Sequence, residues 1–227
     1  MDEIFNFRMN PINLDIDVTF TDTSNKYIAP KPNLGLKKSQ IKFSKAIDLA
    51  KEIILSENER YYCLLSGNFE FGDFIEAFIM TKKIKVKELT IATLSLGKNN
   101  VDSLANLLHW GAVDKINLIV SDYFYAHNKK TAIPYIYREL DFNNQLDLAV
   151  AASHCKVTLI ETKCNKKVVM HGSANLRSSS NTEQLVVECD ESLFDFNYIW
   201  INKILKEYST INKSLRDNKL WQTITAE

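Results

Sequence analysis

The chain has 227 residues, 45% of them hydrophobic and 25% charged, which is typical of one globular domain with appendages and excludes extended disorder. Its 28 basic and 28 acidic residues cancel, so overall charge does not identify a nucleic-acid-binding protein. The sequence has neither an apolar run long enough to span a bilayer nor a basic signal-peptide start, so we expect a cytoplasmic protein without membrane contact.

Residues 1–43 form the first predicted segment, an N-terminal arm with one or two short strands. It contains Pro11, Pro30 and Pro32 and shows no helical period. Residues 31–45 hold five lysines and no acidic residue, a pattern that suits either contact with phosphates or a solvated surface. Residues 44–208 are expected to form the main domain, and 209–227 a loosely docked tail.

Strands and helices alternate regularly through the first part of the main domain. Apolar runs predict strands over 61–66, 89–96, 116–120 and 146–152. Helices are expected between them: one capped by Ser44 with Ile47, Ala50, Ile53 and Ile54 on one face, one with Asp73 and Glu76 as a capping pair, one starting near Asn100, and one with Pro134 in its first turn. This βαβαβαβ order predicts parallel pairing in a sheet covered on both faces.

The rhythm changes after residue 152. Short β-like segments over 157–161, 167–171 and 183–189 are connected by short loops, so they are expected to pair antiparallel. A helix over 194–208 closes the domain.

His154 and Lys156 carry the strongest chemical signal in the chain. If they lie on a strand, alternation places both side chains on one face, just past a buried parallel strand. Open α/β sheets bind ligands at that carboxyl edge. An imidazole can attack phosphorus while an ammonium group holds a phosphate oxygen, so the pair predicts phosphodiester chemistry.

A second group of residues is suited to hold the phosphate. Gly172 allows close approach of the backbone, and Ser173 and Asn175 offer a hydroxyl and an amide donor from one side. Such donors stabilise charge that develops on phosphate oxygens. Glu183 is expected to accept a hydrogen bond from a histidine ring and so select its tautomer.

These residues together resemble the single-motif, bacterial dimeric nuclease branch of the phospholipase D superfamily. The family signature is His-x-Lys-x-x-x-x-Asp followed by Gly-Ser-x-Asn. The matching residues are His154, Lys156, Glu161, Gly172, Ser173 and Asn175, and the family's Asn-x-Glu segment is matched by Asn181, Thr182 and Glu183. The resemblance covers about two thirds of the chain and implies a phospholipase D-like α/β sandwich.

The resemblance also implies a mechanism. Family members need two such motifs facing each other, one histidine as nucleophile and the other as acid, so a single-motif chain works as a homodimer with the active site across the two-fold axis. The implied reaction is metal-independent hydrolysis through a phosphohistidine intermediate, without a cofactor.

The chain departs from the family pattern at two points. Glu161 stands where the family has Asp, and ten residues separate it from Gly172, more than the family has. In the family that acid supports catalysis rather than attacking, so the replacement bears on efficiency.

Several other residues allow more than one interpretation. Arg177 either binds a flanking phosphate or is a solvated loop arginine. His171 either contacts the substrate or faces outward. His127, after three aromatic residues, suits base stacking, core packing or a dimer interface. Four cysteines without a Cys-x-x-Cys pair indicate free thiols and no zinc site.

The sequence therefore predicts an enzyme, a phosphodiester hydrolase and most specifically an endonuclease of low sequence specificity. The alternative is a catalytically weak or inactive module that binds nucleic acid or docks a partner. DNA, RNA and other phosphodiesters all stay open as substrates. A lipid substrate would call for an amphipathic or apolar membrane surface, and the sequence offers no strong example.

Overall fold

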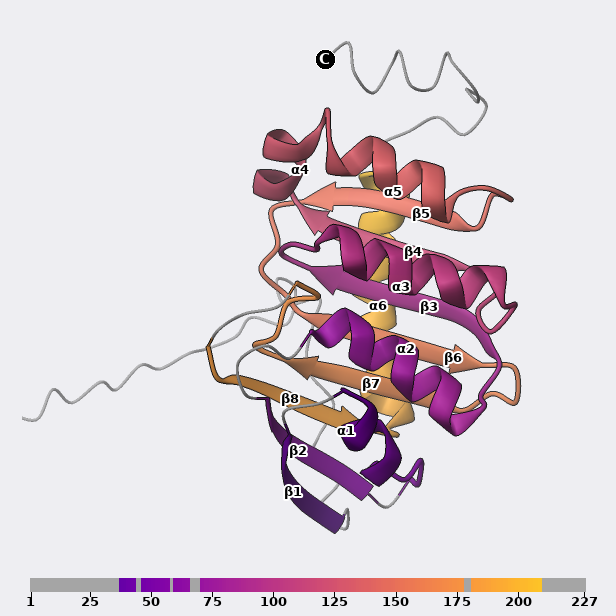
Figure 1. The fold of residues 1–227 in the computed structure, drawn as a ribbon, viewed down its shortest axis with the longest axis vertical. Coiled ribbons are helices and arrows are strands. Elements are labelled where there is room, and N and C mark those ends of the chain that lie inside the picture. The colour runs from indigo at the N-terminus through magenta and orange to yellow at the C-terminus, as the bar shows by residue number, and fades with distance from the viewer. Residues whose placement is uncertain (1–36, 44–45, 58, 66–69, 178–180, 210–227) are drawn as a thin grey trace, which may run out of the picture.

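One eight-stranded sheet forms the centre of the computed structural model, which describes residues 37–43, 46–57, 59–65, 70–177 and 181–209 (Figure 1). The strands are β1 (Lys37–Phe43), β2 (Glu59–Leu65), β3 (Val86–Thr93), β4 (Ile116–Ser121), β5 (Leu146–Ala151), β6 (Val157–Thr162), β7 (Lys167–Gly172) and β8 (Glu183–Glu188). The helices are α1 (Ala46–Glu52), α2 (Phe71–Lys82), α3 (Lys98–His109), α4 (Asp122–Asn128), α5 (Ala132–Leu140) and α6 (Glu191–Glu207).

The strands lie in the order β1-β2-β8-β7-β6-β3-β4-β5. The pairs β1–β2, β3–β4 and β4–β5 are parallel, and the other four pairs are antiparallel. Six strands consequently run in one direction, and only β6 and β8 run in the other. The predicted fold class is confirmed as an α/β fold with a central sheet flanked by helices and an antiparallel segment at the motif, although the pairing is mixed and four of the seven strand pairs are antiparallel.

The expectation of one continuous parallel series was wrong. Strands β8, β7 and β6 separate β2 from β3. The reason is burial: the middle residues of β6 and β7 and the second half of β8 are buried, so these strands need neighbours on both sides and helices on both faces. A position at the edge of the sheet would expose them.

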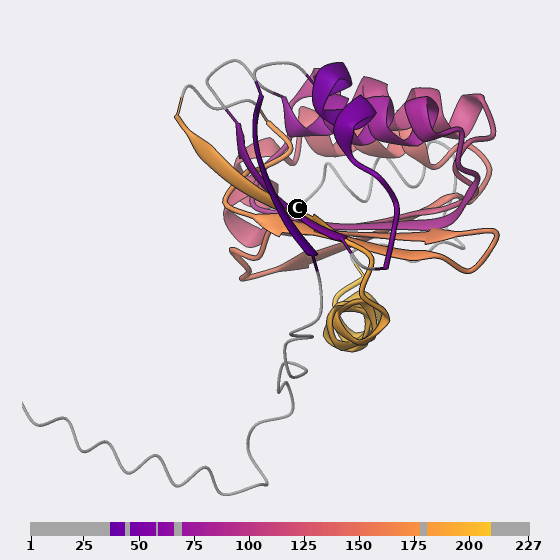
Figure 2. The same ribbon diagram turned by 90° about the horizontal axis from the view of Figure 1, so that it is seen from below.

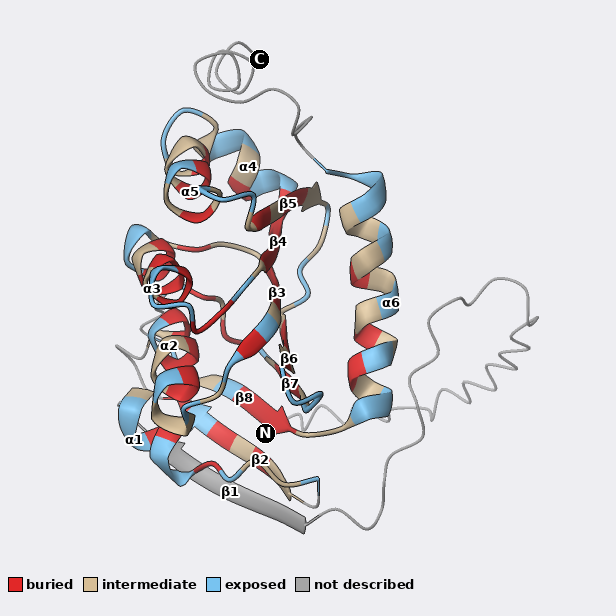
Figure 3. Ribbon diagram, turned by 90° about the vertical axis from the view of Figure 1, so that its right-hand side faces the viewer, coloured by how far each residue is buried: buried red, intermediate tan, exposed pale blue. Residues whose placement is uncertain are grey.

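Helices cover both faces of the sheet, but unequally. Helices α1 to α5 lie on one face, while α6 alone crosses the other (Figure 2). In both helix layers the buried residues are found on the parts of the ribbon that lie toward the sheet (Figure 3). Phe74 and Leu104 belong to the larger core, and Phe194 and Ile201 of α6 pack with Leu159 of β6 in the smaller one.

Helix α2, with the residue Glu70 that precedes it, is joined to α3 by three side-chain pairs of equal spacing. The pairs are Asn100 with Glu70 (3.3 Å), Ser103 with Asp73 (3.1 Å) and Asn106 with Glu76 (3.0 Å), and in each the α3 residue donates. The predicted capping role of Asp73 and Glu76 was therefore wrong. Helical periodicity places residues three apart on one face, where a neighbouring helix can reach them.

The predicted face of α1 was only partly right. Ala50 and Ile53 are buried, but Ile47 and Ile54 are half or more exposed, and Leu49 is buried in their place. Ser44 lies outside the described residues. The helix ends at Glu52, so Ile53 and Ile54 follow it and do not continue its face.

Residues 37–43, the last part of the predicted arm with its possible short strands, form the edge strand β1, which pairs with β2. Residues 1–36 and 210–227 lie outside the described residues, so the rest of the arm and tail assignments stay predictions. Among the described helices, none is long and apolar enough to cross a membrane.

Candidate active site

The carboxyl edge of the sheet carries the motif. Strands β3, β4, β5 and β7 end there, and β6 and β8 begin there, because Val157 pairs with Ala92 and Leu185 pairs with Gly172. The edge therefore collects the loop before β6, the loop after β7 and the start of β8. These three segments, together with Gly172 at the end of β7, contain all the predicted site residues except Glu161.

His154 and Lys156 lie in the loop between β5 and β6 and not on a strand as expected. His154 and Cys155 are both exposed, and Lys156 is half-buried. The Lys156 ammonium donates to the His154 carbonyl oxygen at 3.1 Å. Within the described residues the imidazole of His154 has no hydrogen-bonding partner, so it is free to meet a ligand.

Gly172 connects this loop to the second part of the motif. Its N–H donates to the carbonyl oxygen of Lys156 at 3.4 Å. A Cβ at this position would lie 2.0 Å from the carbonyl oxygen of Gln184, so only glycine fits between the strands. The sequence-based reason for this glycine, close approach of backbone, is the observed one, although the approaching group is β8 and not a phosphate.

Ser173 and Glu183 are bonded to each other. The Ser173 hydroxyl donates to the Glu183 carboxylate and accepts from the Gln184 N–H at 2.9 Å. Within the described residues the Glu183 carboxylate has Ser173 as its partner, and its expected acceptance from a histidine ring stays a prediction. A hydroxyl has one hydrogen, so Ser173 can donate to a phosphate only when it releases Glu183.

Asn175 lies in the loop after Ser173. Its amide oxygen is buried, and within the described part of the chain it has no hydrogen-bonding partner. An unpaired buried acceptor costs about 1–3 kcal/mol, which a donor from a ligand or a second chain would recover.

The same loop is fixed to the sheet at Leu176. The Leu176 N–H donates to Thr93 Oγ1 at 3.4 Å, and its carbonyl accepts from the Gly72 N–H at 3.2 Å. Arg177 follows and is exposed, in a position open to a flanking anion.

Glu161 is the one matched residue that the fold does not bring to this edge. It lies near the far end of β6, opposite Glu88 of β3, and pairs with Lys87 at 2.8 Å. Four residue steps separate it from Val157, roughly 13 Å along the strand. Glu161 therefore has a structural position here, remote from His154.

Sequence reasoning missed a cluster on the α6 face of the sheet. Glu188 of β8 is buried, and its carboxylate accepts from Arg60 of β2 and contacts His171 Nε2 at 3.1 Å. These three residues line a hollow of about 350 Å³ between the sheet and α6. The sequence did contain one signal for this cluster, which is Glu188 at the end of the apolar strand β8. A carboxylate that is buried with such a strand requires a hydrogen-bonding or charged partner.

The cluster changes the ionisation of Glu188. Burial alone would raise its pKa, but the hydrogen bonds from His171 and Arg60 and the charge of Arg60 outweigh burial, so the pKa of Glu188 is lowered. His171, for which substrate contact and outward orientation were both open, is thus committed to Glu188.

The arrangement supplies a free imidazole, an ammonium group, backbone and amide donors and an arginine at one edge. These groups suit attack on, and charge stabilisation of, a tetrahedral anion. In the described ranges no three His, Cys, Asp or Glu side chains are grouped so as to hold a metal ion. The four cysteines, all in described segments, are free thiols.

The chain matches no protein-family model, and a search of curated proteins finds no relative. It is similar in fold to Nuc, a phospholipase D family member from Salmonella typhimurium, with 15% identity, a TM-score of 0.44, and coverage of 57% of this chain and 85% of Nuc. It is also similar to phosphatidylserine synthase of Haemophilus influenzae, with 12% identity, a TM-score of 0.47, and coverage of 73% of this chain and 43% of the synthase. A third similar structure is yeast tyrosyl-DNA phosphodiesterase, with 13% identity, a TM-score of 0.36, and coverage of 56% of this chain and 31% of that enzyme. These likenesses concern the fold and give this chain no activity, substrate or partner.

Proposed function

We propose that the chain is a phosphodiesterase of the phospholipase D type, acting as a homodimeric endonuclease of low sequence specificity. The observation that carries the proposal is the hydrogen bond from Gly172 N–H to Lys156 carbonyl, which joins the loop of His154 to the loop of Ser173. A nucleophile and a set of anion donors thereby share one exposed edge.

The proposed reaction has two steps. An imidazole nitrogen of His154 attacks phosphorus, forming a P–N bond as the P–O ester bond breaks, and the leaving oxygen takes a proton from an acid. Water then attacks phosphorus, loses a proton to the same acid–base group, and releases His154. Lys156 and Asn175 would stabilise the charge on the phosphate oxygens in both steps.

The acid in this scheme is His154 of a second copy. A two-fold axis through the edge would bring two copies of the motif around one phosphate. The lone imidazole of His154 and the unpaired amide oxygen of Asn175 support this, since both lack a partner among the described residues.

Cleavage assays in EDTA test the chemistry. Single- and double-stranded DNA and RNA are incubated with the wild-type chain, with His154→Ala, and with His109→Ala as a matched control. His109 is also exposed but contacts Phe142 far from the motif, with ring centroids 5.5 Å apart. We expect His154→Ala to abolish cleavage and His109→Ala to keep it; equal cleavage by all three would refute the proposal.

Subunit mixing tests the shared site. If each dimer has one site that needs both histidines, an equal mixture of wild type and His154→Ala, after subunit exchange, keeps about a quarter of the wild-type activity. Independent sites would keep about half. Salt-sensitive binding of nucleic acid without any cleavage would select the alternative, a binding module that has lost turnover.

A further inference from the structure

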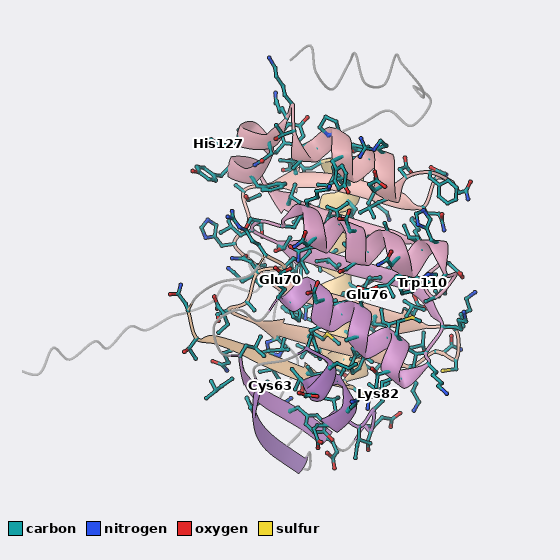
Figure 4. The ribbon with its side chains drawn as sticks, in the orientation of Figure 1. Cys63, Glu70, Glu76, Lys82, Trp110 and His127 are labelled. Carbon is teal, nitrogen blue, oxygen red and sulfur yellow. The ribbon has the colours of Figure 1, made fainter. Side chains whose placement is uncertain are left out.

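Helix α4 presents an exposed aromatic pair at the same edge as His154. The rings of Tyr123 and His127 lie one helical turn apart, with centroids separated by 4.1 Å and planes tilted by 38°. Tyr123 is 69% exposed, and His127 is also exposed. Figure 4 shows His127 at the edge where β4 ends. Two adjacent exposed rings of this kind offer a surface on which a flat ligand can stack.

The pair is fixed in place before any ligand arrives. Ser121, the last residue of β4, caps α4 by accepting from the Phe124 N–H at 3.0 Å, and Phe124 is buried. The Nδ1–H group of His127 donates to the Tyr123 carbonyl at 2.8 Å, which holds the imidazole beside the phenol ring. A rigid platform loses little entropy when a flat ring stacks on it.

We propose that Tyr123 and His127 form a platform on which an unpaired base of a single-stranded nucleic acid stacks. This inference rests on the proposed nuclease function and assigns its substrate class. A base in a duplex has both faces covered by its neighbours, so an exposed aromatic ring on a protein surface can stack only on an unpaired base.

The position of α4 suits a strand whose phosphate lies at His154. Strands β3 and β4 follow β6 in the sheet, so α4 begins two strand spacings from the start of β6, roughly 10 Å. That distance is about three steps at the 3.4 Å rise of one stacked strand. A base close to the cleaved phosphate would therefore reach the platform.

The surrounding charges favour a polyanion over an apolar protein partner. Lys129 and Lys130 follow the platform, and the Lys129 ammonium lies 5.4 Å from the centre of the Tyr125 ring. The acidic neighbour Asp122 accepts a hydrogen bond from the Tyr123 N–H at 2.7 Å, and the two lysines outnumber its single negative charge. Aromatic faces between lysines are the composition that single-stranded nucleic acids require.

The test measures binding in the full-length His154→Ala protein, in which we expect no cleavage. Anisotropy of a labelled single-stranded oligonucleotide and of the matching duplex is recorded with Tyr123→Ala, Tyr123→Phe and Trp110→Ala added singly. Trp110 is the matched control, because it is 54% exposed and lies at the opposite edge (Figure 4).

We expect Tyr123→Ala to weaken single-strand binding by about 5- to 150-fold, with little effect on the duplex. Tyr123→Phe and Trp110→Ala should keep the affinity. If the chain cleaves nucleic acid but Tyr123→Ala binds single strands normally, the platform is refuted and the nuclease function stands. A change from dimer to monomer mass in Tyr123→Ala, without loss of single-strand affinity, would refute it in favour of a subunit interface.

Two further results separate this inference from the proposed function. Single-strand binding that depends on Tyr123, in a wild-type chain that cleaves nothing, would support the platform and refute the nuclease. A wild-type chain that neither binds nor cleaves any nucleic acid would overturn both.

Discussion

His171 of β7 and Glu188 of β8 contact each other at 3.1 Å across the middle of the sheet, while Arg60 of β2 bonds the same carboxylate. Three neighbouring strands are thereby joined through one buried acid. The contact also holds the end of β7, from which the Gly172 and Ser173 loop emerges, so the cluster supports the strand end that leads into the candidate site.

Glu188→Gln should destabilise the fold by about 2–3 kcal/mol, because it leaves the partly buried Arg60 without a counter-charge. Urea unfolding measures the change. Glu191→Gln is the control: Glu191 pairs with Lys167 but its side chain is 77% exposed, so its loss should stay within about 0.5 kcal/mol. Equal effects of the two variants would show that burial of Glu188 does not matter.

The lowered pKa of Glu188 makes stability depend on pH. A carboxyl whose folded pKa lies below its ordinary value of 4.5 contributes stability that is fully present above that value and is lost as pH falls through the folded pKa. The urea midpoint of the wild type should therefore fall more steeply below pH 4.5 than that of Glu188→Gln. Parallel curves for the two proteins would contradict this expectation.

Gly172→Ala should disrupt the junction of β7 and β8, since the added Cβ would lie 2.0 Å from the Gln184 carbonyl oxygen. We expect a loss of about 2 kcal/mol or more in unfolding free energy, together with reduced cleavage. Gly97→Ala, where the nearest atom is 3.5 Å away, should cost only about 0.5–1 kcal/mol, because alanine is a poorer N-cap of α3 than glycine. A Gly172→Ala protein as stable as Gly97→Ala would argue against the observed strand register.

Glu161→Gln should keep cleavage within about twofold of wild type, because Glu161 pairs with Lys87 at the far end of β6. Glu183→Gln should reduce kcat about tenfold or more, since Glu183 orients the Ser173 hydroxyl. Steady-state kinetics on one oligonucleotide compares them. A loss in Glu161→Gln as large as in Glu183→Gln would restore a catalytic role for Glu161.

Periodicity in the sequence was enough to predict most of the elements, because helices and strands with one buried face leave a pattern of apolar residues. Pairing between distant segments leaves no such pattern, so the insertion of β6, β7 and β8 between β2 and β3 could not be derived. Asp73 and Glu76 were assigned to a helix cap because local hydrogen bonds are all that a sequence window contains, whereas their partners Ser103 and Asn106 are 30 residues away.

The candidate site was predicted in composition but not in detail. The argument that His154 and Lys156 share one face requires both residues to lie on a strand. They lie just before β6 begins, and sequence patterns locate the ends of elements less well than their presence. Glu161 was matched to the family motif by the number of residues that separate it from Lys156. Because most of those residues lie on the extended strand β6, Glu161 is far from His154 and away from the carboxyl edge. Arg60 and Glu188 are 128 residues apart and share no motif.

The strand order also sets when the molecule becomes functional during folding. The β1–β2 pair and the β3–β4–β5 group are contiguous in sequence and can form early, but only β6, β7 and β8 connect them, and these are made last. Joining the two halves closes a loop of more than a hundred residues, so the final step should be slow. Cleavage activity should therefore appear only with the slowest refolding phase, because His154, Ser173 and Glu183 are assembled by the segment that completes the sheet.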